Sequence, residues 1–411
     1  MRILIVHNYY GSDAPSGENI AVDAEIKLLR MNGHEVEVFS KRSDSLRAKG
    51  IAGKLKAGLL FIYNLKAKKE LSSILNNFKA DVVHVHNTFP ILSNSIFEIL
   101  LKEDIPVLIT LHNYRYSCAN GLHIRNKTVC TTCIGKSVPI AALKHRCYKA
   151  SFLQTIPWFF SKCLSIFKAG TNIINIDGII VLSDFQKSLL IKNGFNERNI
   201  YIKPNFTFSS NSNEIFPQVT TNNEFEVTFV GRLSEEKGLR TLLKAWKHWG
   251  GSAPMLNIVG DGELKSKITE ESTARKLNVK FHGHLDRSGV ERILDRTSLL
   301  VVPSECYETF GLVIIEAFSR GIPVLGSDMG AIPSVIDRDV DGLIFRQKDY
   351  IDLFTKAKAL FDSKALLEKL SANAYISYKN KFSEKAAYSN LMKIYNAVLI
   401  ERKNNDRKLS P

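Results

Sequence analysis

The stretch from Val301 to Asp328 constrains the fold most, because, with the two residues before it, it divides into four blocks with distinct patterns. Leu299 to Val302 is a continuous apolar run, as in a strand buried on both faces. A polar loop follows, and Gly311 to Arg320 then repeats apolar residues at helical spacing until a glycine ends it. Ile322 to Gly326 has the composition of another strand. The stretch therefore predicts a strand–loop–helix–strand unit of an α/β sheet.

Two carboxylates of this unit, Glu308 and Glu316, have seven residues between them and flank the predicted helix start. The first N–H groups of a helix lack an intrahelical partner, so the backbone around Phe310, Gly311 and Leu312 can bind an anionic phosphate. One carboxylate can accept hydrogen bonds from sugar hydroxyls and the other from a ribose. Either glutamate alone is more often simply solvated. The combination predicts a site for a nucleotide diphosphate sugar.

This block resembles the E-x7-E signature of the retaining glycosyltransferases of family 4, and the resemblance continues through Gly330 to Phe345. The string from Gly231 to Gly238 (GRLSEEKG) is also similar to a motif of that family. The resemblance implies the GT-B fold, in which two Rossmann-like α/β domains face each other across a cleft. It implies transfer of a sugar from a nucleotide diphosphate sugar with retention at the anomeric carbon.

The resemblance also implies roles for individual residues. Arg232 and Lys237 would stabilise the departing diphosphate, for which a guanidinium fork and a flexible ammonium are suited. Glu308 would orient the sugar ring, Glu316 would bind the ribose, and His112 would lie near the reacting carbon. A lone basic pair or histidine at a strand end is more often structural. No metal is expected for catalysis, because these groups replace it.

Four further residues are weaker candidates by the same resemblance. Gly17 would lie in a loop, Gly11 to Asn19, that reaches the donor phosphates. Gly260 and His284, at predicted strand ends, would cradle the base, and His86 would line the acceptor side. The chain has no G-x-G-x-x-G after its first strand, which argues against a dinucleotide oxidoreductase.

The length of 411 residues suffices for two domains with substantial cores. We predict an N-terminal acceptor-binding domain at 1–206, a polar linker at 207–224 and a nucleotide-sugar-binding domain at 225–380. Residues 381–411 would form a helix crossing back to the first domain, followed by a frayed basic tail. Besides those above, strands are predicted at Arg2–Tyr9, Glu35–Ser40, Asp81–His86, Pro106–His112, Gly178–Asp184, Asn199–Asn205, Phe225–Leu233, Met255–Gly262 and Val279–His284.

The N-terminal domain carries a cysteine-rich insertion, 118–147, with Cys118, Cys130, Cys133 and Cys147 in the spacing C-x11-C-x2-C-x13-C. The C-x2-C pair is a usual zinc half-site, and the outer two cysteines can complete a tetrahedron. Two histidines, at 123 and 145, are spare ligands. Four reduced, partly buried thiols are an equally good interpretation. A zinc ion here would be structural, because four thiolates leave no open position.

The formal net charge of +15 allows anionic partners, but nothing resembles a nucleic-acid-binding module. Lys41 to Glu70 is basic around an apolar patch, and Phe152 to Phe167 carries aromatic residues beside Lys162 and Lys168. Such segments lie on anionic membranes or are solvated helix faces. The chain shows no signal peptide or spanning run. We therefore expect a cytoplasmic protein that associates peripherally with the inner face of the cell membrane.

The sequence thus predicts a glycosyltransferase that moves a sugar from a UDP- or GDP-sugar to a glycan or lipid-linked glycan in surface polysaccharide synthesis. One alternative is a nucleotide-sugar epimerase of the same fold. Another is a non-catalytic protein that binds a sugar nucleotide or polysaccharide, although the presence of Arg232, Lys237 and Glu308 argues against it. A phosphorylase would need a lysine anchoring pyridoxal phosphate, and no such motif is evident.

Overall fold

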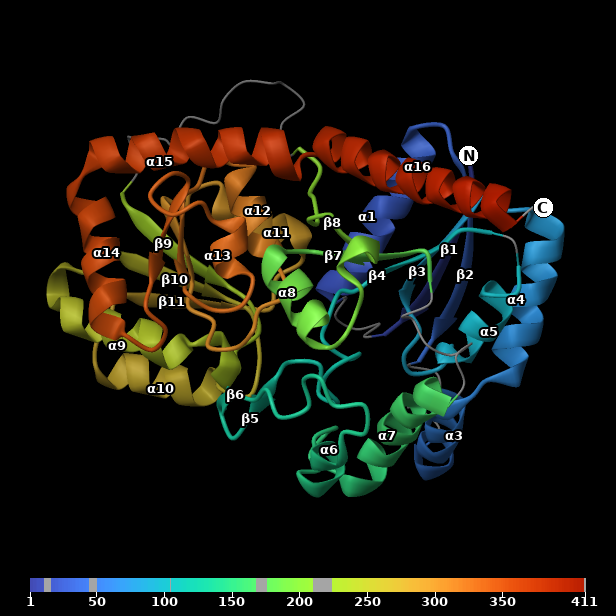
Figure 1. Ribbon diagram of the computed structural model, residues 1–411. Coiled ribbons are helices and arrows are strands. Elements are labelled where there is room, and N and C mark those ends of the chain that lie inside the picture. The colour runs from blue at the N-terminus through green and yellow to red at the C-terminus, as the bar shows by residue number, and fades with distance from the viewer. Residues whose placement is uncertain (11–15, 44–49, 104, 168–175, 210–223, 410–411) are drawn as a thin grey trace. The chain divides into compact units, whose positions relative to one another are not determined.

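The computed structural model describes residues 1–10, 16–43, 50–103, 105–167, 176–209 and 224–409 (Figure 1). The chain forms two compact units. Unit 1 comprises residues 1–123, 130–204 and 387–411, and unit 2 comprises residues 124–129 and 205–386. Most of the predicted linker, residues 210–223, lies outside the described residues. Within the described residues, no helix is long and apolar enough to cross a membrane.

Unit 1 is built on a parallel sheet with the strand order β2-β1-β3-β4-β7-β8. Its strands are β1 (Arg2–Tyr9), β2 (Glu35–Arg42), β3 (Val82–Asn87), β4 (Val107–Thr110), β7 (Gly178–Val181) and β8 (Ile200–Ile202). Its helices include α1 (Gly17–Met31), α3 (Gly50–Ile62), α4 (Leu65–Phe78), α5 (Phe97–Leu100), α6 (Ile140–Lys144), α7 (Phe152–Phe167) and α8 (Asp184–Lys192). β3 and β4 are buried along their whole length, as parallel strands covered on both faces are.

The C-terminal helix α16 (Glu384–Leu409) packs on unit 1. Leu391, Tyr395 and Val398 join Ile3 and Ile5 of β1 in one buried cluster. The prediction of a frayed tail is wrong as far as residue 409, because α16 continues to that residue. An ion pair of 3.0 Å between Arg402 and Asp177 accompanies this continuation.

Unit 2 contains a second parallel sheet with the order β11-β10-β9-β12-β13-β14. Its strands are β9 (Glu226–Val230), β10 (Met255–Val259), β11 (Val279–Gly283), β12 (Leu299–Val302), β13 (Val324–Ser327) and β14 (Gly342–Phe345). Its helices are α9 (Leu239–Trp249), α10 (Lys265–Ala274), α11 (Arg287–Leu294), α12 (Leu312–Phe318), α13 (Ile332–Val335), α14 (Tyr350–Asp362) and α15 (Lys364–Ser377). A short antiparallel hairpin, β5 (Ile124–Arg125) and β6 (Thr128–Val129), also belongs to this unit.

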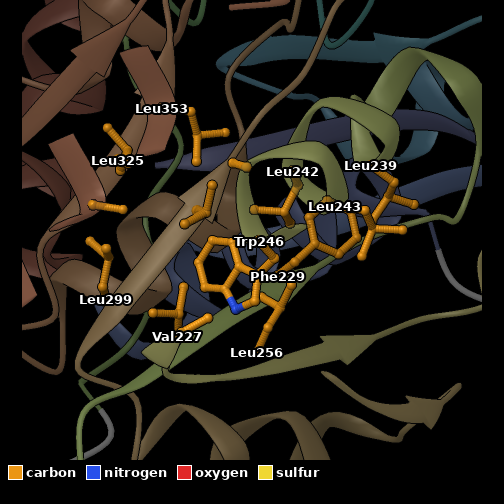
Figure 2. Close-up of a cluster of buried hydrophobic side chains, with 14 of the residues drawn as sticks. Val227, Phe229, Leu239, Leu242, Leu243, Trp246, Leu256, Leu299, Leu325 and Leu353 are labelled. Atoms are coloured by element: carbon orange, nitrogen blue, oxygen red, sulfur yellow. The ribbon is translucent and has the colours of Figure 1, made fainter. Parts of the chain in front are cut away.

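The core of unit 2 fixes the start of α9 against the sheet. Leu239, Leu242 and Trp246 of α9 lie over Val227 and Leu256 of the sheet (Figure 2). All five side chains are fully buried. This packing holds the loop between β9 and α9, which carries the predicted basic pair, in a fixed place on the sheet.

Two predicted element boundaries are wrong near the candidate site. The predicted loop Gly11 to Asn19 ends early, because α1 already begins at Gly17. The side chain of Ser16 caps this helix by accepting a hydrogen bond from the Asn19 N–H. The predicted helix Gly311 to Arg320 is shorter, Leu312 to Phe318, because Gly311 adopts a left-handed conformation with φ of 87°.

Candidate active site

In unit 2 the strand order reverses between β9 and β12, and ligands of open α/β sheets bind at such a point, beyond the carboxyl ends of the strands. Lys237 follows β9, and Glu308 follows β12. Lys237 donates a hydrogen bond of 2.7 Å from Nζ to Oε2 of Glu308. Ser304 Oγ donates a second bond, of 3.0 Å, to the same oxygen. Two residues predicted to serve donor binding separately are therefore paired with each other.

The Lys237–Glu308 pair is mostly shielded from water, with side chains 24% and 15% exposed. Burial raises the pKa of Glu308, but the Lys237 charge and the hydrogen bonds outweigh it and leave the pKa below its usual value. Burial lowers the pKa of Lys237, but Glu308 and the neighbouring groups raise it by more. The pKa of Lys237 therefore lies above its usual value. Both groups are therefore charged at neutral pH, as a site for a diphosphate and sugar hydroxyls requires.

Arg232 lies in the same loop region and is more open. Its guanidinium donates to Glu236 Oε1 over 2.9 Å, and its side chain is 61% exposed. Its charge also lowers the pKa of Glu308, so it lies near the Lys237–Glu308 pair. Surface ion pairs of this kind are weak, so Arg232 can exchange Glu236 for a phosphate at small cost.

Glycines fix the loops around this pair by close backbone approach. A Cβ at Gly238 would lie 1.8 Å from the carbonyl oxygen of Pro303, and Gly238 has a φ of 71°. A Cβ at Gly330 would lie 2.4 Å from the backbone nitrogen of Glu308. The loops that follow β9, β12 and β13 thus touch backbone to backbone, which allows no side chain at these positions.

The other predicted residues of unit 2 lie around these loops. Glu316 is on α12, partly buried, and burial raises its pKa against the opposing charge of Arg320. Phe310 is buried in the core, and Gly311 and Leu312 are partly exposed at the start of α12. Phosphate binding by the backbone at the start of this seven-residue helix stays a prediction.

The predicted base-binding positions Gly260 and His284 differ in environment. Gly260 follows β10, and a Cβ there would lie 1.9 Å from the carbonyl oxygen of Gly231. Close packing therefore accounts for this glycine without a ligand. His284 is exposed directly after β11.

In unit 1 polar residues gather where β1, β3 and β4 end. His112, just beyond β4, places Nε2 3.0 Å from Nδ1 of His86 on β3, and the two rings stack. His86 Nε2 lies 3.4 Å from Oε1 of Glu25, and Glu25 Oε2 accepts a 2.5 Å hydrogen bond from Lys203. These contacts form the series Lys203–Glu25–His86–His112. Of its members, only His86 and His112 were predicted as site residues.

Burial keeps these histidines neutral. It lowers the pKa of His86 to about 4 and that of His112 well below its usual value, and the neighbouring histidine charges add to the effect. Burial raises the pKa of Glu25, but the Lys203 and His84 charges outweigh it. The Glu25 carboxylate favours a proton on His86 Nε2, so His86 Nδ1 accepts from His112 Nε2–H. The lone pair of His112 is then on Nδ1, which is buried and has no hydrogen-bond partner among the described residues.

Glu25, His84 and His86 offer three metal-ligand atoms within 4.8 Å of one another. However, Lys203 already provides a cation to Glu25. Both ring nitrogens of His84 are also engaged, Nδ1 with Tyr395 Oη at 2.8 Å and Nε2 with Thr110 Oγ1 at 2.7 Å. We therefore assign this cluster no metal.

Glu18 is a candidate site residue that was not predicted from the sequence. It is in the first turn of α1 and accepts hydrogen bonds from Tyr10 Oη (2.8 Å) and from Asn113 Nδ2 (3.1 Å), next to His112. Burial raises the pKa of its carboxyl to about 7. Such a shifted group beside other polar residues is typical of a functional site. Gly17, predicted in a phosphate loop, is instead the first residue of the same helix.

The four cysteines of the insertion are only partly buried. Among the described residues, Glu25, His84 and His86 bring three ligand atoms within 4.8 Å of one another, whereas no three of these sulfurs lie that close together. The thiols therefore do not form a tight ligand set as they stand.

Two family models match the chain. "Glycosyltransferase Family 4" matches residues 16–207, and "Glycosyl transferases group 1" matches residues 211–377, so that together they span most of the chain. The chain belongs to this family of glycosyltransferases. The predicted family and fold are thereby confirmed. The family matches also support the prediction that the chain is a glycosyltransferase.

Two relatives of this glycosyltransferase are named for a cps region and for capsular polysaccharide biosynthesis. An uncharacterised 41.2 kDa protein in the cps region of Klebsiella pneumoniae is 23% identical over 81% of each chain. The Staphylococcus aureus capsular polysaccharide biosynthesis glycosyltransferase CapM is 26% identical, over 51% of this chain and 55% of its own. Among solved structures, Anabaena HepE in complex with UDP-glucose has a TM-score of 0.63 at 17% identity, covering 96% of this chain and 100% of that one. This last likeness shows the GT-B fold.

Proposed function

We propose that this glycosyltransferase transfers a sugar from a UDP- or GDP-sugar, with retention at the anomeric carbon, to a glycan or lipid-linked glycan of a surface polysaccharide. The observation that carries the proposal is the shielded Lys237–Glu308 pair at the reversal of strand order, with Arg232 nearby. It combines cations for a diphosphate with a carboxylate for sugar hydroxyls. HepE, of the same fold, has been solved with UDP-glucose, which supports a nucleotide sugar donor.

In the proposed reaction, the bond between the anomeric carbon and the diphosphate oxygen breaks as the acceptor hydroxyl attacks the same face of the sugar. The leaving phosphate takes the acceptor's proton. Lys237 and Arg232 stabilise the negative charge that develops on the diphosphate, which is why no catalytic metal is needed. Glu308 keeps Lys237 charged and accepts hydrogen bonds from the sugar, and Glu316 accepts from the ribose.

His112 is proposed to contact the sugar. Its orientation is set by His86, which is in turn oriented by Glu25 and Lys203. A neutral imidazole suits this role, because a second positive charge would oppose the oxocarbenium character that develops at the anomeric carbon.

The acceptor side is proposed to approach an anionic membrane through α3 and α7, which lie side by side (Figure 1). Leu59 of α3 and Leu153 and Phe160 of α7 are 71%, 76% and 51% exposed. The basic segment contributes less than its sequence suggests, since Lys68 pairs with Glu98 at 2.5 Å and Lys41 pairs with Glu70. Residues 44–49 and Lys168 lie outside the described part of the chain.

The test begins with a panel of UDP- and GDP-sugars, each assayed for protection against thermal unfolding. The protecting sugar nucleotide is then incubated with glycan acceptors, and the anomeric configuration of the product is read by NMR. An α-linked product from an α-linked donor is expected. An inverted product overturns retention, and a changed sugar nucleotide without transfer indicates an epimerase. Protection without any turnover indicates a binding protein.

A further inference from the structure

The cysteine-rich insertion, which belongs to unit 1 except for residues 124–129, has little regular structure to hold it. Between the end of β4 and the start of α7, the described chain has the two-residue strands β5 and β6 and the five-residue helix α6. A small apolar cluster lies beneath, formed by Phe61, Phe89, Ala119, Ala142 and Trp158. A segment of this length with so small a core usually needs a cross-link.

The cysteines converge on this cluster. Cys133 and Cys147 pack against it, and Cys118 is adjacent to its member Ala119. The Cys147 N–H donates to the carbonyl of Ala142, another member, over 3.0 Å. Residues far apart in the sequence are therefore brought to one place by the packing, including three of the four cysteines.

Backbone N–H groups face two of the sulfurs. Those of Asn120, Gly121 and His123 lie toward Cys118, and that of Ala142 lies toward Cys133. The four cysteines are also near enough to interact electrostatically, Cys118 with Cys130, and Cys133 with Cys118, Cys130 and Cys147. Four thiolates gathered in this way repel one another, and a divalent cation turns that repulsion into attraction.

The histidines nearby are poor ligands. His123 is buried, with Nε2 2.9 Å from Ser117 Oγ and Nδ1 3.1 Å from the Cys130 carbonyl oxygen. His145 is exposed. The four cysteines are therefore the natural set.

We propose that Cys118, Cys130, Cys133 and Cys147 bind a structural Zn²⁺ through four thiolates. Two side chains must turn for this, because Cys118 Sγ is hydrogen-bonded to Asn120 Oδ1 (3.0 Å) and Cys130 Sγ lies 3.4 Å from Thr132 Oγ1. Both contacts are to residues two positions along, so side-chain rotation releases them. Each thiol loses its proton to solvent, and the ion closes the insertion. The site is independent of the proposed sugar transfer.

The test measures zinc in the full chain purified without chelator. We expect about one zinc per chain, as in a single structural site. The Cys133→Ser variant should lose most of it, and the matched control Cys163→Ser, which changes a partly exposed cysteine of α7 outside the set, should retain it. Cobalt substituted for zinc in the wild type should show sulfur-to-metal charge transfer and tetrahedral ligand-field bands.

If the Cys133→Ser variant fails to fold, a second measurement on the wild-type protein tests the proposal. A mercurial thiol reagent added to the wild-type protein should release the zinc as the four thiols react. Protein without zinc that also gives no cobalt bands overturns the proposal. So does mass spectrometry that finds the four cysteines joined in disulfides, or a Cys163→Ser variant that loses the metal as completely as Cys133→Ser.

Discussion

Lys237 Nζ and Glu308 Oε2 lie 2.7 Å apart, although the two residues are 71 positions apart in the sequence. The pair joins the loop after β9 to the loop after β12, the two strands between which the sheet order reverses. In the proposed reaction, a donor diphosphate that approaches Lys237 meets an ammonium already held in place and kept charged by a carboxylate. This pre-organisation is what electrostatic stabilisation of a leaving group requires.

The first prediction concerns the basic pair. Arg232→Ala and Lys237→Ala should each lower kcat/KM by about 10²-fold or more, the usual effect of removing one stabilising donor from a transition state. Lys244→Ala, which changes an exposed lysine of α9, is the control and should leave the rate unchanged. Transfer by the Arg232→Ala/Lys237→Ala double variant at the wild-type rate would remove both residues from the mechanism.

The second prediction concerns metal dependence. Activity should survive a short incubation with EDTA, because Lys237 and Arg232 provide the cationic charge that Mg²⁺ provides elsewhere. The initial rate is measured before and directly after the chelator is added, and again after Mg²⁺ is restored. An immediate loss that Mg²⁺ reverses would contradict a metal-independent mechanism. A slow loss that parallels unfolding reports instead on the proposed zinc site.

The third prediction concerns the buried ion pair of unit 1. Glu25→Leu should lower the free energy of unfolding by roughly 3 kcal/mol or more, because it removes the carboxylate from a buried ammonium. The double variant Glu25→Leu/Lys203→Met removes both charges and should recover much of the loss. Urea unfolding of the wild type, both single variants and the double variant measures the coupling. Strictly additive losses would show that the pair is not coupled.

The sequence was sufficient to predict strands that contain a continuous apolar run. β1, which contains the run Ile3 to Val6, and β12, which is apolar throughout, begin and end where predicted, because a parallel strand buried on both faces has such a run. The start of α1 was missed because Gly17 suggested a loop, whereas the preceding Ser16 provides a side-chain cap. Local signals thus gave the elements, and errors arose where two local signals disagreed.

The pairings in the site could not be predicted in this way. Glu25 and Lys203 are 178 positions apart, and no periodicity relates them. Their contact arises because α1 packs on the sheet of which β8 is the edge strand, and Lys203 directly follows β8. The raised pKa of Glu18 has the same origin, because burial depends on what covers a residue and not on its neighbours in the chain.

The fourth prediction concerns the membrane. Replacing Leu153 and Phe160 of α7 by serine should reduce recovery of the protein with floated anionic vesicles, because both side chains are largely exposed and have apolar area to bury in lipid. Ile376→Ser, which changes an exposed apolar residue of α15 in unit 2, is the control. Equal recovery of the wild type with anionic and neutral vesicles, at low and high salt, would contradict the proposed anionic surface.

The last prediction is a pH dependence due to Glu18. Its carboxyl has a pKa of about 7 in the folded chain and 4.5 as the reference value, so the folded state binds the proton more tightly than the unfolded state. The resulting stability is fully present below pH 4.5 and is lost as the pH rises through about 7. The two values correspond to a total change of roughly 3 kcal/mol. Glu18→Gln mimics the protonated carboxyl and should remove this slope, whereas Glu37→Gln, on the exposed side of β2, should keep it. Urea unfolding of the three proteins across this pH range measures the difference, and a slope unchanged in Glu18→Gln would assign it to another group.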